Sequence, residues 1–509
     1  LFGEMGLLDD GVRSAMAPRP LRILMISSEV ESLARTGGLG DVVEALSLAL
    51  ADEGAHVLVV TPRYGVTRVP REVRRWPGLV PVRHGWGPED VRRVGVVELE
   101  TWRSARSGGT RRVCLIEDAG LYERQGIYGD GWGTFGDNAM RFAVLSRAGL
   151  EISARIWRDG SDVIHAHDWH AAFAVLYAKL VMGERWAATP AVFTVHNLAF
   201  QGVYGYELLD RLHLPRGAFV PEVLAHEGNV NLLKGATALA DRITTVSPTY
   251  AREILTPEGG MGLDVHLRAH AHRLVGILNG IDTARFDPAT DVALACRYDV
   301  QTFERGRAEC KAALAAELGL ARGDGPMFAI VSRLTAQKGM DLLLPLLDEL
   351  VGEGVRIVAV GQGEPWLEDA LVAAAERYPA RVAARIAFDP RLSRRVYAGA
   401  DFFLVPSRFE PCGLTQMYAM RYGAIPIVTD VGGLHDTVTP IVDGDERGTG
   451  VVLASATGAE LRAACLRAMA LYAEPGRMRA ARARAMAQDF SWREPARAYL
   501  DLYAQVVKR

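Results

Sequence analysis

The chain has 509 residues, enough for about two to four domains with large apolar cores. Its 58 basic and 61 acidic residues give a net charge of −3, which excludes a protein whose whole surface is basic for nucleic-acid binding. The five cysteines form no Cys-x-x-Cys pair, so we expect neither a disulfide scaffold nor a zinc ribbon, and reduced thiols in a cytoplasm are the default. No apolar run reaches the ~18–20 residues of a membrane span.

Short apolar runs in the first half of the chain are typical of buried parallel strands. They lie at 21–27, 56–61, 113–116, 163–165, 191–195 and 243–246, with helical patterns between several of them, notably at 139–157 and 169–183. The helix expected after residue 36 has Val42, Val43, Leu46 and Leu50 on one side. Residues 1–20 are expected to be an extension, disordered or ancillary to this fold.

The same pattern starts again in the second half. Apolar runs at 327–332, 355–360, 381–387, 402–405 and 425–428 alternate with helical segments. Two such series predict two Rossmann-like domains, at 21–268 and 269–488, followed by an amphipathic helix within 489–509. Ligands of open α/β sheets bind at the carboxyl ends of the strands, so we expect the site in a cleft where the two domains face each other.

Two glycine pairs follow strands and open helices. Gly37-Gly38 comes after the first strand, directly after Arg35 and Thr36, and Gly432-Gly433 repeats the arrangement in the second series. Such a turn lets a ligand approach the backbone, and the helix that follows offers free N–H groups to an anion. A tight turn without a ligand is the alternative. The Gly-x-Gly-x-x-Gly fingerprint of nicotinamide cofactors is absent from the first loop.

Charged residues follow two strands of the second series. Arg333 and Lys338 come after the strand at 327–332, where two cations suit a diphosphate, although a solvated basic turn is possible. Glu410 follows the strand at 402–405 and is placed either to bind sugar hydroxyls or to pair with a helix N-terminus. The amides of 412–415 could cap a phosphate. Nucleophilic catalysis by Cys412 is disfavoured, because cysteine is often buried and inert.

A histidine-rich motif, His-Ala-His-Asp-Trp-His at 165–170, ends another strand. His165 and His167 share one face of the strand, which makes a metal pair geometrically possible. A metallohydrolase would need an aspartate where Trp169 stands, and no clear second ligand cluster follows, so polar contacts to a substrate are favoured. His196 ends the next strand beside a polar, Gly-ended loop, where a structural histidine is the alternative to a substrate contact.

These segments, in this order, resemble bacterial glycogen synthase and plant starch synthase. The matching motifs run collinearly between residues 21 and 509 and include TGGLGDV at 36–42, HAHDWH at 165–170, TVHNLAFQG at 194–202, LNGID at 278–282, SRLTAQKG at 332–339 and PSRFEPCGLTQ at 406–416. The resemblance implies the α/β GT-B architecture: two Rossmann-like domains that face each other across a deep cleft, and a C-terminal helix that packs back toward the N-terminal domain. It implies no metal and no cofactor.

The activity implied by the resemblance is transfer of glucose from ADP-glucose to the non-reducing end of an α-1,4-glucan such as glycogen, with retention of configuration. The catalytic residues would be His196, Glu410, Arg333, Lys338 and Asp168. Of these, Arg333 and Lys338 would neutralise the diphosphate, Glu410 would hold the transferred glucose, and His196 would lie near its 6-hydroxyl and anomeric centre. Further substrate-binding residues are expected to be Arg35, Gly37, Gly38, Asp41, Asn197, Asn279, Phe388, Cys412, Gly413, Leu414, Thr415, Gly432 and Gly433.

Four positions depart from, or discriminate within, the family pattern. Arg35 stands where the family usually has lysine, and Ala387-Phe388 stands where it usually has Gly-Tyr beside the nucleotide base, so UDP-glucose is an alternative donor. Tyr418 stands where related retaining families place a second glutamate, which favours the glycogen and starch synthase branch. A related retaining α-glucosyltransferase and a catalytically silent glucan-binding protein are further alternatives. Neither a nucleic acid nor a membrane is expected as a partner.

Overall fold

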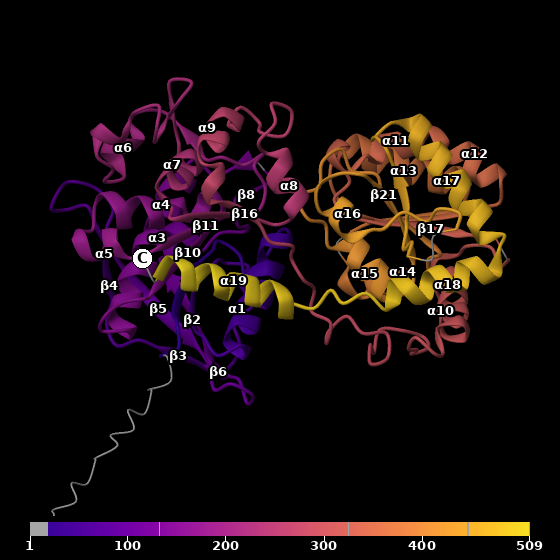
Figure 1. Cartoon of the computed structure of the whole chain (residues 1–509), viewed down its shortest axis with the longest axis horizontal. Helices are drawn as coiled ribbons and strands as arrows, with labels where there is room; N and C mark the ends of the chain where they lie inside the picture. Colours follow the sequence, from indigo (N-terminus) through magenta and orange to yellow (C-terminus); the bar gives the residue numbers. More distant parts are fainter. Residues whose placement is uncertain (1–18, 132, 324, 388, 445–446, 508–509) are drawn as a thin grey trace, which may run out of the picture.

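The computed structural model describes residues 19–131, 133–323, 325–387, 389–444 and 447–507. Most of the expected N-terminal extension and the expected base-stacking Phe388 lie outside these ranges. Two α/β domains lie side by side, each built on its own sheet (Figure 1). Within the described ranges, no helix is both long and apolar enough to span a bilayer.

The first sheet has 11 strands, of which the central ones are parallel and buried. Their apolar runs are continuous because helices cover both faces of the sheet. The parallel strands, in their order across the sheet, are β16 (Leu274–Gly276), β15 (Arg242–Thr245), β11 (Ala191–Val195), β10 (Val163–His167), β1 (Arg22–Ile26), β2 (His56–Pro62) and β7 (Thr110–Glu117). An antiparallel extension beyond β7, not predicted from the sequence, consists of β3 (Val73–Arg75), β4 (Val80–Arg83), β5 (Val91–Leu99) and β6 (Trp102–Arg103).

Alternate residues of β1 face two different apolar cores. Ile23 and Met25 pack with α1 (Gly38–Asp52) and α19 (Arg493–Val507), whereas Leu24 and Ile26 pack in the core that holds α3 (Asn138–Ile156) and α4 (Asp168–Leu180). The apolar side predicted for α1 is confirmed, since its four residues are all buried. Shorter elements of this domain are α2 (Ala119–Tyr122), α5 (Glu184–Ala188), α6 (Leu208–Arg211), α7 (Leu232–Leu239), α8 (Pro248–Glu253), α9 (Asp264–Ala269), β8 (Gly129–Asp130), β9 (Gly133–Thr134), β12 (Val203–Tyr204), β13 (Ala225–His226) and β14 (Asn229–Asn231).

The second sheet has six parallel strands in the order β19-β18-β17-β20-β21-β22. These are β17 (Met327–Val331), β18 (Arg356–Gly361), β19 (Val382–Ile386), β20 (Phe402–Val405), β21 (Ile425–Thr429) and β22 (Val451–Leu453). Its helices are α10 (Phe303–Leu318), α11 (Met340–Leu343), α12 (Leu347–Gly352), α13 (Pro365–Arg377), α14 (Pro390–Gly399), α15 (Thr415–Arg421), α16 (Gly432–Thr437), α17 (Gly458–Tyr472) and α18 (Pro475–Met486).

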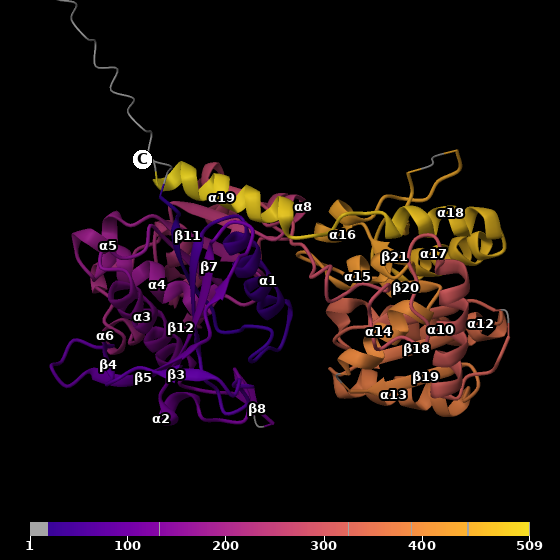
Figure 2. The same cartoon turned by 90° about the horizontal axis from the view of Figure 1, so that it is seen from below.

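The chain passes between the domains twice. The first sheet extends through Gly276, beyond the boundary expected at residue 268, and the chain then crosses to the second domain. It returns after α18, and the two crossing segments are joined where the amide of Ile281 donates to the carbonyl of Phe490 at 2.7 Å. The returning helix α19 lies along the first domain, as both views show (Figures 1 and 2).

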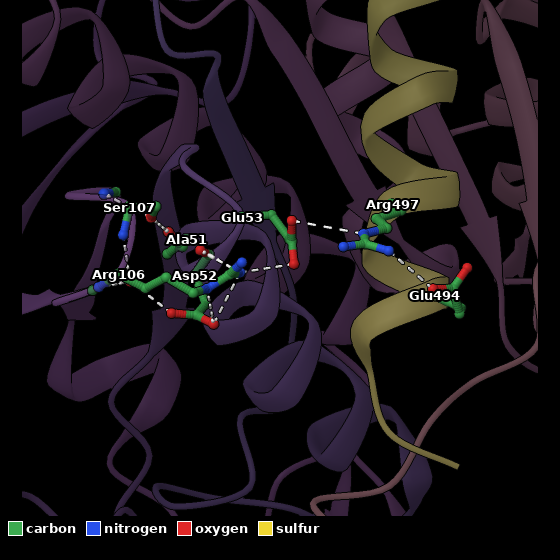
Figure 3. A network of polar contacts seen from close by, with 9 residues as sticks. Ala51, Asp52, Glu53, Arg106, Ser107, Glu494 and Arg497 are labelled. Atoms are coloured by element: carbon green, nitrogen blue, oxygen red, sulfur yellow. Dashed lines mark hydrogen bonds and ion pairs between the residues drawn. The ribbon is translucent and has the colours of Figure 1, made fainter. Parts of the chain in front are cut away.

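The docking of α19 onto the first domain combines an apolar face with a polar margin. Tyr499, Leu502, Tyr503 and Val506 are buried against the first sheet and α1. At the margin, Arg497 lies 3.8 Å from Glu53 at the end of α1 and 3.2 Å from Glu494 (Figure 3). The predicted fold class is therefore confirmed, including the C-terminal helix that packs back onto the N-terminal domain.

Candidate functional site

The predicted site residues of the first domain follow neighbouring parallel strands. Asp168 comes directly after β10 and opens α4, and His196 comes directly after β11. The loop from residue 27 to Gly37 follows β1, which pairs with β10 on the other side. Because the carboxyl ends of parallel strands meet at one edge of the sheet, the topology brings these three segments together.

His167, Asp168 and His196 form a buried polar cluster at this edge. Nδ1 of His167 lies 3.0 Å from Nε2 of His196, and the amide of His196 donates to Oδ1 of Asp168 at 2.7 Å. Burial lowers the pKa of His196 to about 3, so its ring is neutral near pH 7. Burial also raises the pKa of Asp168 to about 7, although the amides of residues 196 and 197 oppose this shift. Asn197 follows in the same loop and is half-buried.

The first glycine loop is held by a carboxylate that the sequence did not single out. Glu29 is buried and accepts hydrogen bonds from the amide of Thr36 at 2.7 Å, the hydroxyl of Thr36 at 2.8 Å and the amide of Gly37 at 3.2 Å. A Cβ at Gly37 would meet nothing, and one at Gly38 would lie 3.8 Å from Leu414 of the second domain. This loop therefore lies beside the second domain.

Arg35 is part of a network of ion pairs in which basic and acidic side chains alternate. It forms an ion pair with Asp41 and lies 3.4 Å from Glu31, which in turn lies 2.6 Å from Arg285 of the crossing segment. Burial raises the pKa of Asp41 to about 7, while the positive charge of Arg35 acts in the opposite direction. Arg35, expected as a substrate-binding cation, is thus held in place by carboxylates of its own domain.

In the second domain, two of the predicted catalytic residues contact each other. Nζ of Lys338 forms an ion pair with Oε2 of Glu410, and the hydroxyl of Ser407 donates to the same oxygen at 3.0 Å. Glu410 is only 6% exposed. Arg333 lies on the same loop as Lys338 but is exposed, with Nη2 3.4 Å from the side-chain oxygen of Gln337. The structure thus places Lys338 against the carboxylate and Arg333 apart from it.

The turn that follows Glu410 is built by backbone geometry. Gly413 has a φ of +70°, and the side-chain amide of Gln416 donates to the carbonyl of Gly413 at 2.9 Å. Leu414 and Thr415 then lead into α15. Cys412 is buried, which raises the pKa of its thiol to about 12, although hydrogen bonding with Asn279 acts in the opposite direction. The thiol is therefore protonated and a poor nucleophile near pH 7.

Both amides of the second glycine pair donate hydrogen bonds to other groups of the protein. The amide of Gly433 donates to the carbonyl of Glu410 at 3.1 Å, and the amide of Gly432 donates to Oε1 of Glu253 at 2.8 Å. Glu253 belongs to α8 of the first domain. The Gly432 amide that the sequence pattern offers to an anion is therefore occupied by a carboxylate from the other domain.

Contacts between α8 and α16 join the site loops of the two domains. The hydroxyl of Ser247 donates to the carbonyl of Pro411 at 2.6 Å. The amide and hydroxyl of Thr249 donate to the two carboxylate oxygens of Asp436 at 2.8 and 2.7 Å. Nearby, Asn279 lies in the crossing segment and lines a cavity of about 560 Å³ together with Phe490. The structure thus brings the loops of both domains to one interface.

The histidine motif at 165–170 is engaged in contacts with other protein groups. Among the described residues, no three His, Cys, Asp or Glu side chains are grouped so that they could hold an ion. His165 instead bonds Thr194 and Tyr503, both at 2.7 Å. Sequence reasoning also missed Glu29 and Glu253 as supports of the site, and it did not predict the contact of Tyr503 with His165. Only Glu29 had a signal, since it is an acid that follows a buried strand within three residues.

Comparison with known proteins identifies the family. The model of the starch synthase catalytic domain matches residues 22–269, and that of glycosyl transferases group 1 matches residues 325–470. A glycogen synthase of Myxococcus xanthus is 45% identical over 96% of this chain and 100% of its own length. Another, from Anaeromyxobacter sp. strain Fw109-5, is 43% identical over 95% of this chain and 99% of its own length.

Solved structures agree with this result. The catalytic domain of starch synthase IV from Arabidopsis thaliana, bound to ADP and acarbose, has a TM-score of 0.86 and 32% identity over 96% of this chain and 100% of that one. Sucrose-phosphate synthase from Thermosynechococcus elongatus has a TM-score of 0.59 at 19% identity, over 96% and 99% of the two chains, and shows the fold alone. The chain therefore belongs to the glycogen synthase and starch synthase family of glucosyltransferases.

Proposed function

We propose that this chain transfers glucose from ADP-glucose to the non-reducing end of an α-1,4-glucan such as glycogen, with retention of configuration. The observation that carries the proposal is the ion pair between Lys338 and the buried Glu410 in the second domain, joined to the His196–Asp168 cluster of the first by the contacts between α8 and α16. The family membership supports the same reaction, because the similar proteins are glycogen synthases and a starch synthase bound to ADP and acarbose.

The charges of the second domain suit the departure of a nucleoside diphosphate. Lys338 is held close to the end of β17 by Glu410, and Arg333 adds a second cation on the same loop. Fixed cations stabilise the negative charge that develops on the leaving group without reorganising during the reaction. Loss of one such contact typically reduces the rate about 10²- to 10³-fold. Glu410 would accept hydrogen bonds from hydroxyls of the transferred glucose.

For the stereochemical course, we propose departure and attack on the same face of the sugar, with the leaving phosphate accepting the proton of the acceptor hydroxyl. Retention in glycosidases often uses a carboxylate nucleophile. Here Glu410 is paired with Lys338, and Asp168 accepts a hydrogen bond from the amide of His196. Trapping of a covalent glycosyl adduct on either carboxylate would contradict this mechanism.

The experiment is incorporation of labelled glucose into glycogen from ADP-glucose or UDP-glucose, with chelator and without added metal. We expect incorporation from ADP-glucose, and a fall of at least 10²-fold in Lys338→Ala. A preference for UDP-glucose would retain the mechanism and assign the donor choice to Arg35 and the segment 387–390. No incorporation from either donor, in a protein that still binds glycogen, would favour the silent glucan-binding alternative.

A further inference from the structure

Three histidines and one tyrosine form a continuous chain between α19 and the site. The hydroxyl of Tyr503 lies 2.7 Å from Nδ1 of His165, and Nε2 of His165 lies 2.7 Å from the hydroxyl of Thr194. The ring centroids of His165 and His167 are 4.1 Å apart. Nδ1 of His167 then lies 3.0 Å from Nε2 of His196. His196, the proposed catalytic histidine, is thus held by the ring of His167, which has no other role in the proposed mechanism.

The rings of this chain are neutral near pH 7. Burial lowers the pKa of His165 and of His196 to about 3, and it lowers the pKa of His167 well below its ordinary value. A neutral imidazole carries one N–H donor and one nitrogen acceptor. In the contact between His167 and His196, one ring must therefore donate and the other accept.

The surroundings of His167 decide which ring donates. Its Nε2 is buried and has no hydrogen-bond partner among the described residues. With the proton on Nε2, the ring would bury an N–H group without an acceptor, and buried orphan donors are rarer in proteins than under-satisfied acceptors. With the proton on Nδ1, the N–H is satisfied by His196 and only a lone pair stays unpaired. The second arrangement is therefore favoured.

We propose that His167 is a positioning residue that donates from Nδ1–H to Nε2 of His196, and thereby fixes the proton of His196 on Nδ1. His196 would then present Nδ1–H as a hydrogen-bond donor to a hydroxyl of the donor's glucosyl group. This inference rests on the proposed function for the part that concerns glucose. The tautomer itself is a property of the free protein.

His165 and Tyr503 hold His167 rather than act on substrate. His165 is fixed at both ring nitrogens, and its ring lies against that of His167. Tyr503 belongs to the helix that returns from the second domain. Loss of its hydroxyl removes one contact of His165 but leaves the bond between His167 and His196 in place. Tyr503→Phe is therefore the matched control, because it removes another contact of this row of rings and leaves the bond between His167 and His196 in place.

The first test measures directly which ring nitrogen of His196 carries the proton. Protein labelled with ¹⁵N-histidine is studied by long-range ¹H–¹⁵N correlation, and the His196 signals are assigned by their loss in His196→Gln. We expect a protonated Nδ1 and an unprotonated Nε2 on His196. A proton on Nε2 in the wild-type protein would overturn the inference. This measurement does not depend on activity, so it separates failure of the inference from failure of the proposed function.

The second test compares His167→Phe, which keeps a ring without a donor, with His167→Asn, which keeps an amide donor near the position of Nδ1. We expect kcat for glucosyl transfer to fall about tenfold in the Phe variant, as for one lost hydrogen bond, and to be largely restored in the Asn variant. The affinity for ADP, which carries no glucose, should be unchanged in both, which also confirms folding. Tyr503→Phe should retain kcat within about twofold. Equal losses in the Phe and Asn variants, with ADP binding intact, would reject the donor role.

Discussion

Asp168 shows how a single backbone conformation builds part of the site. Its φ is +56°, in the left-handed region, at the residue where β10 ends and α4 begins. Aspartate and asparagine tolerate this region better than other non-glycine residues, because their short side chains can form local hydrogen bonds. This conformation places the carboxylate where it accepts from the amide of His196.

Substitutions at Asp168 should separate backbone strain from charge. In Asp168→Ala, the free energy of unfolding should fall by about 2–3 kcal/mol, because a left-handed alanine is strained and the His196 amide loses its acceptor. Asp168→Asn keeps both the conformational tolerance and an acceptor, and should lose less than about 1 kcal/mol. Urea denaturation followed by circular dichroism measures the difference. Equal losses would assign the stabilisation to the carboxylate charge, which both variants remove, rather than to the φ angle or the hydrogen bond.

The buried carboxyls of Asp41 and Asp168 predict a definite pH dependence of stability. Both have a folded-state pKa of about 7, whereas the unfolded value for aspartate is about 3.9. Between these values the folded state binds more protons than the unfolded state, so these groups make stability fall as pH rises from about 4 to 7 and then level off. The buried histidines act in the opposite sense, because their folded pKa values are lowered.

A comparison of a double variant with the wild-type protein separates the contribution of the two carboxyls to stability from that of the histidines. We expect Asp41→Asn/Asp168→Asn to lose the decline between pH 5 and pH 7 that the two carboxyls contribute, so that its Tm relative to wild type increases with pH. Thermal melts at four pH values from 5 to 8 provide the measurement. A constant Tm difference across this range would contradict the raised pKa values.

Which site residues the sequence could predict depends on how far their partners lie along the chain. The contact between Lys338 and Glu410 could be expected, because each residue follows an apolar strand and the topology of a parallel sheet brings such residues to one edge. Glu253 could not be predicted, because its bond to Gly432 depends on how the two domains meet. The sequence pattern also predicted that the amide of Gly432 could bind an anion. The motif gives no sign that the carboxylate of Glu253, from the other domain, already accepts from this amide.

At the scale of elements, prediction succeeded where a strand is apolar and buried along its whole length. The limits expected for β11 and β20 agree with the structure. The antiparallel strands β3 and β6 were missed, because they are short and largely exposed and so carry no apolar run. β16 was missed for a similar reason, since it has only three residues, and this shifted the expected domain boundary.

Helix α19 stabilises the first domain mainly through its apolar face. Tyr503 is fully buried, so Tyr503→Ala should lower the free energy of unfolding by about 3–5 kcal/mol, as expected for a large buried side chain. Arg497 is 42% exposed, and its contact with Glu53 is long, so Arg497→Ala should cost less than about 1 kcal/mol (Figure 3). Urea denaturation of both variants tests the ranking. A larger loss for Arg497→Ala would assign the docking to the polar margin instead.

At the scale of the whole molecule, the proposed site is assembled from both domains. The histidine cluster follows strands of the first sheet, and the Lys338–Glu410 pair follows strands of the second. Neither domain holds both parts. The bonds from Thr249 to Asp436 and from Gly432 to Glu253 lie between α8 and α16, close to the turn that follows Glu410. Activity should therefore depend on side chains whose only role is to align the domains.

Asp436 provides the sharpest test of this dependence. Both of its carboxylate oxygens accept from Thr249, so Asp436→Ala should leave each domain folded but loosen the interface, and kcat/KM for ADP-glucose should fall about tenfold. Thr249→Val should have a smaller effect, since it keeps the amide bond, and the double variant should be no worse than Asp436→Ala, because both changes remove one interaction. Asp443→Ala is the control, as this residue is 93% exposed and pairs with Arg477 of its own domain. Strictly additive losses in the double variant would show that Thr249 and Asp436 act independently of each other.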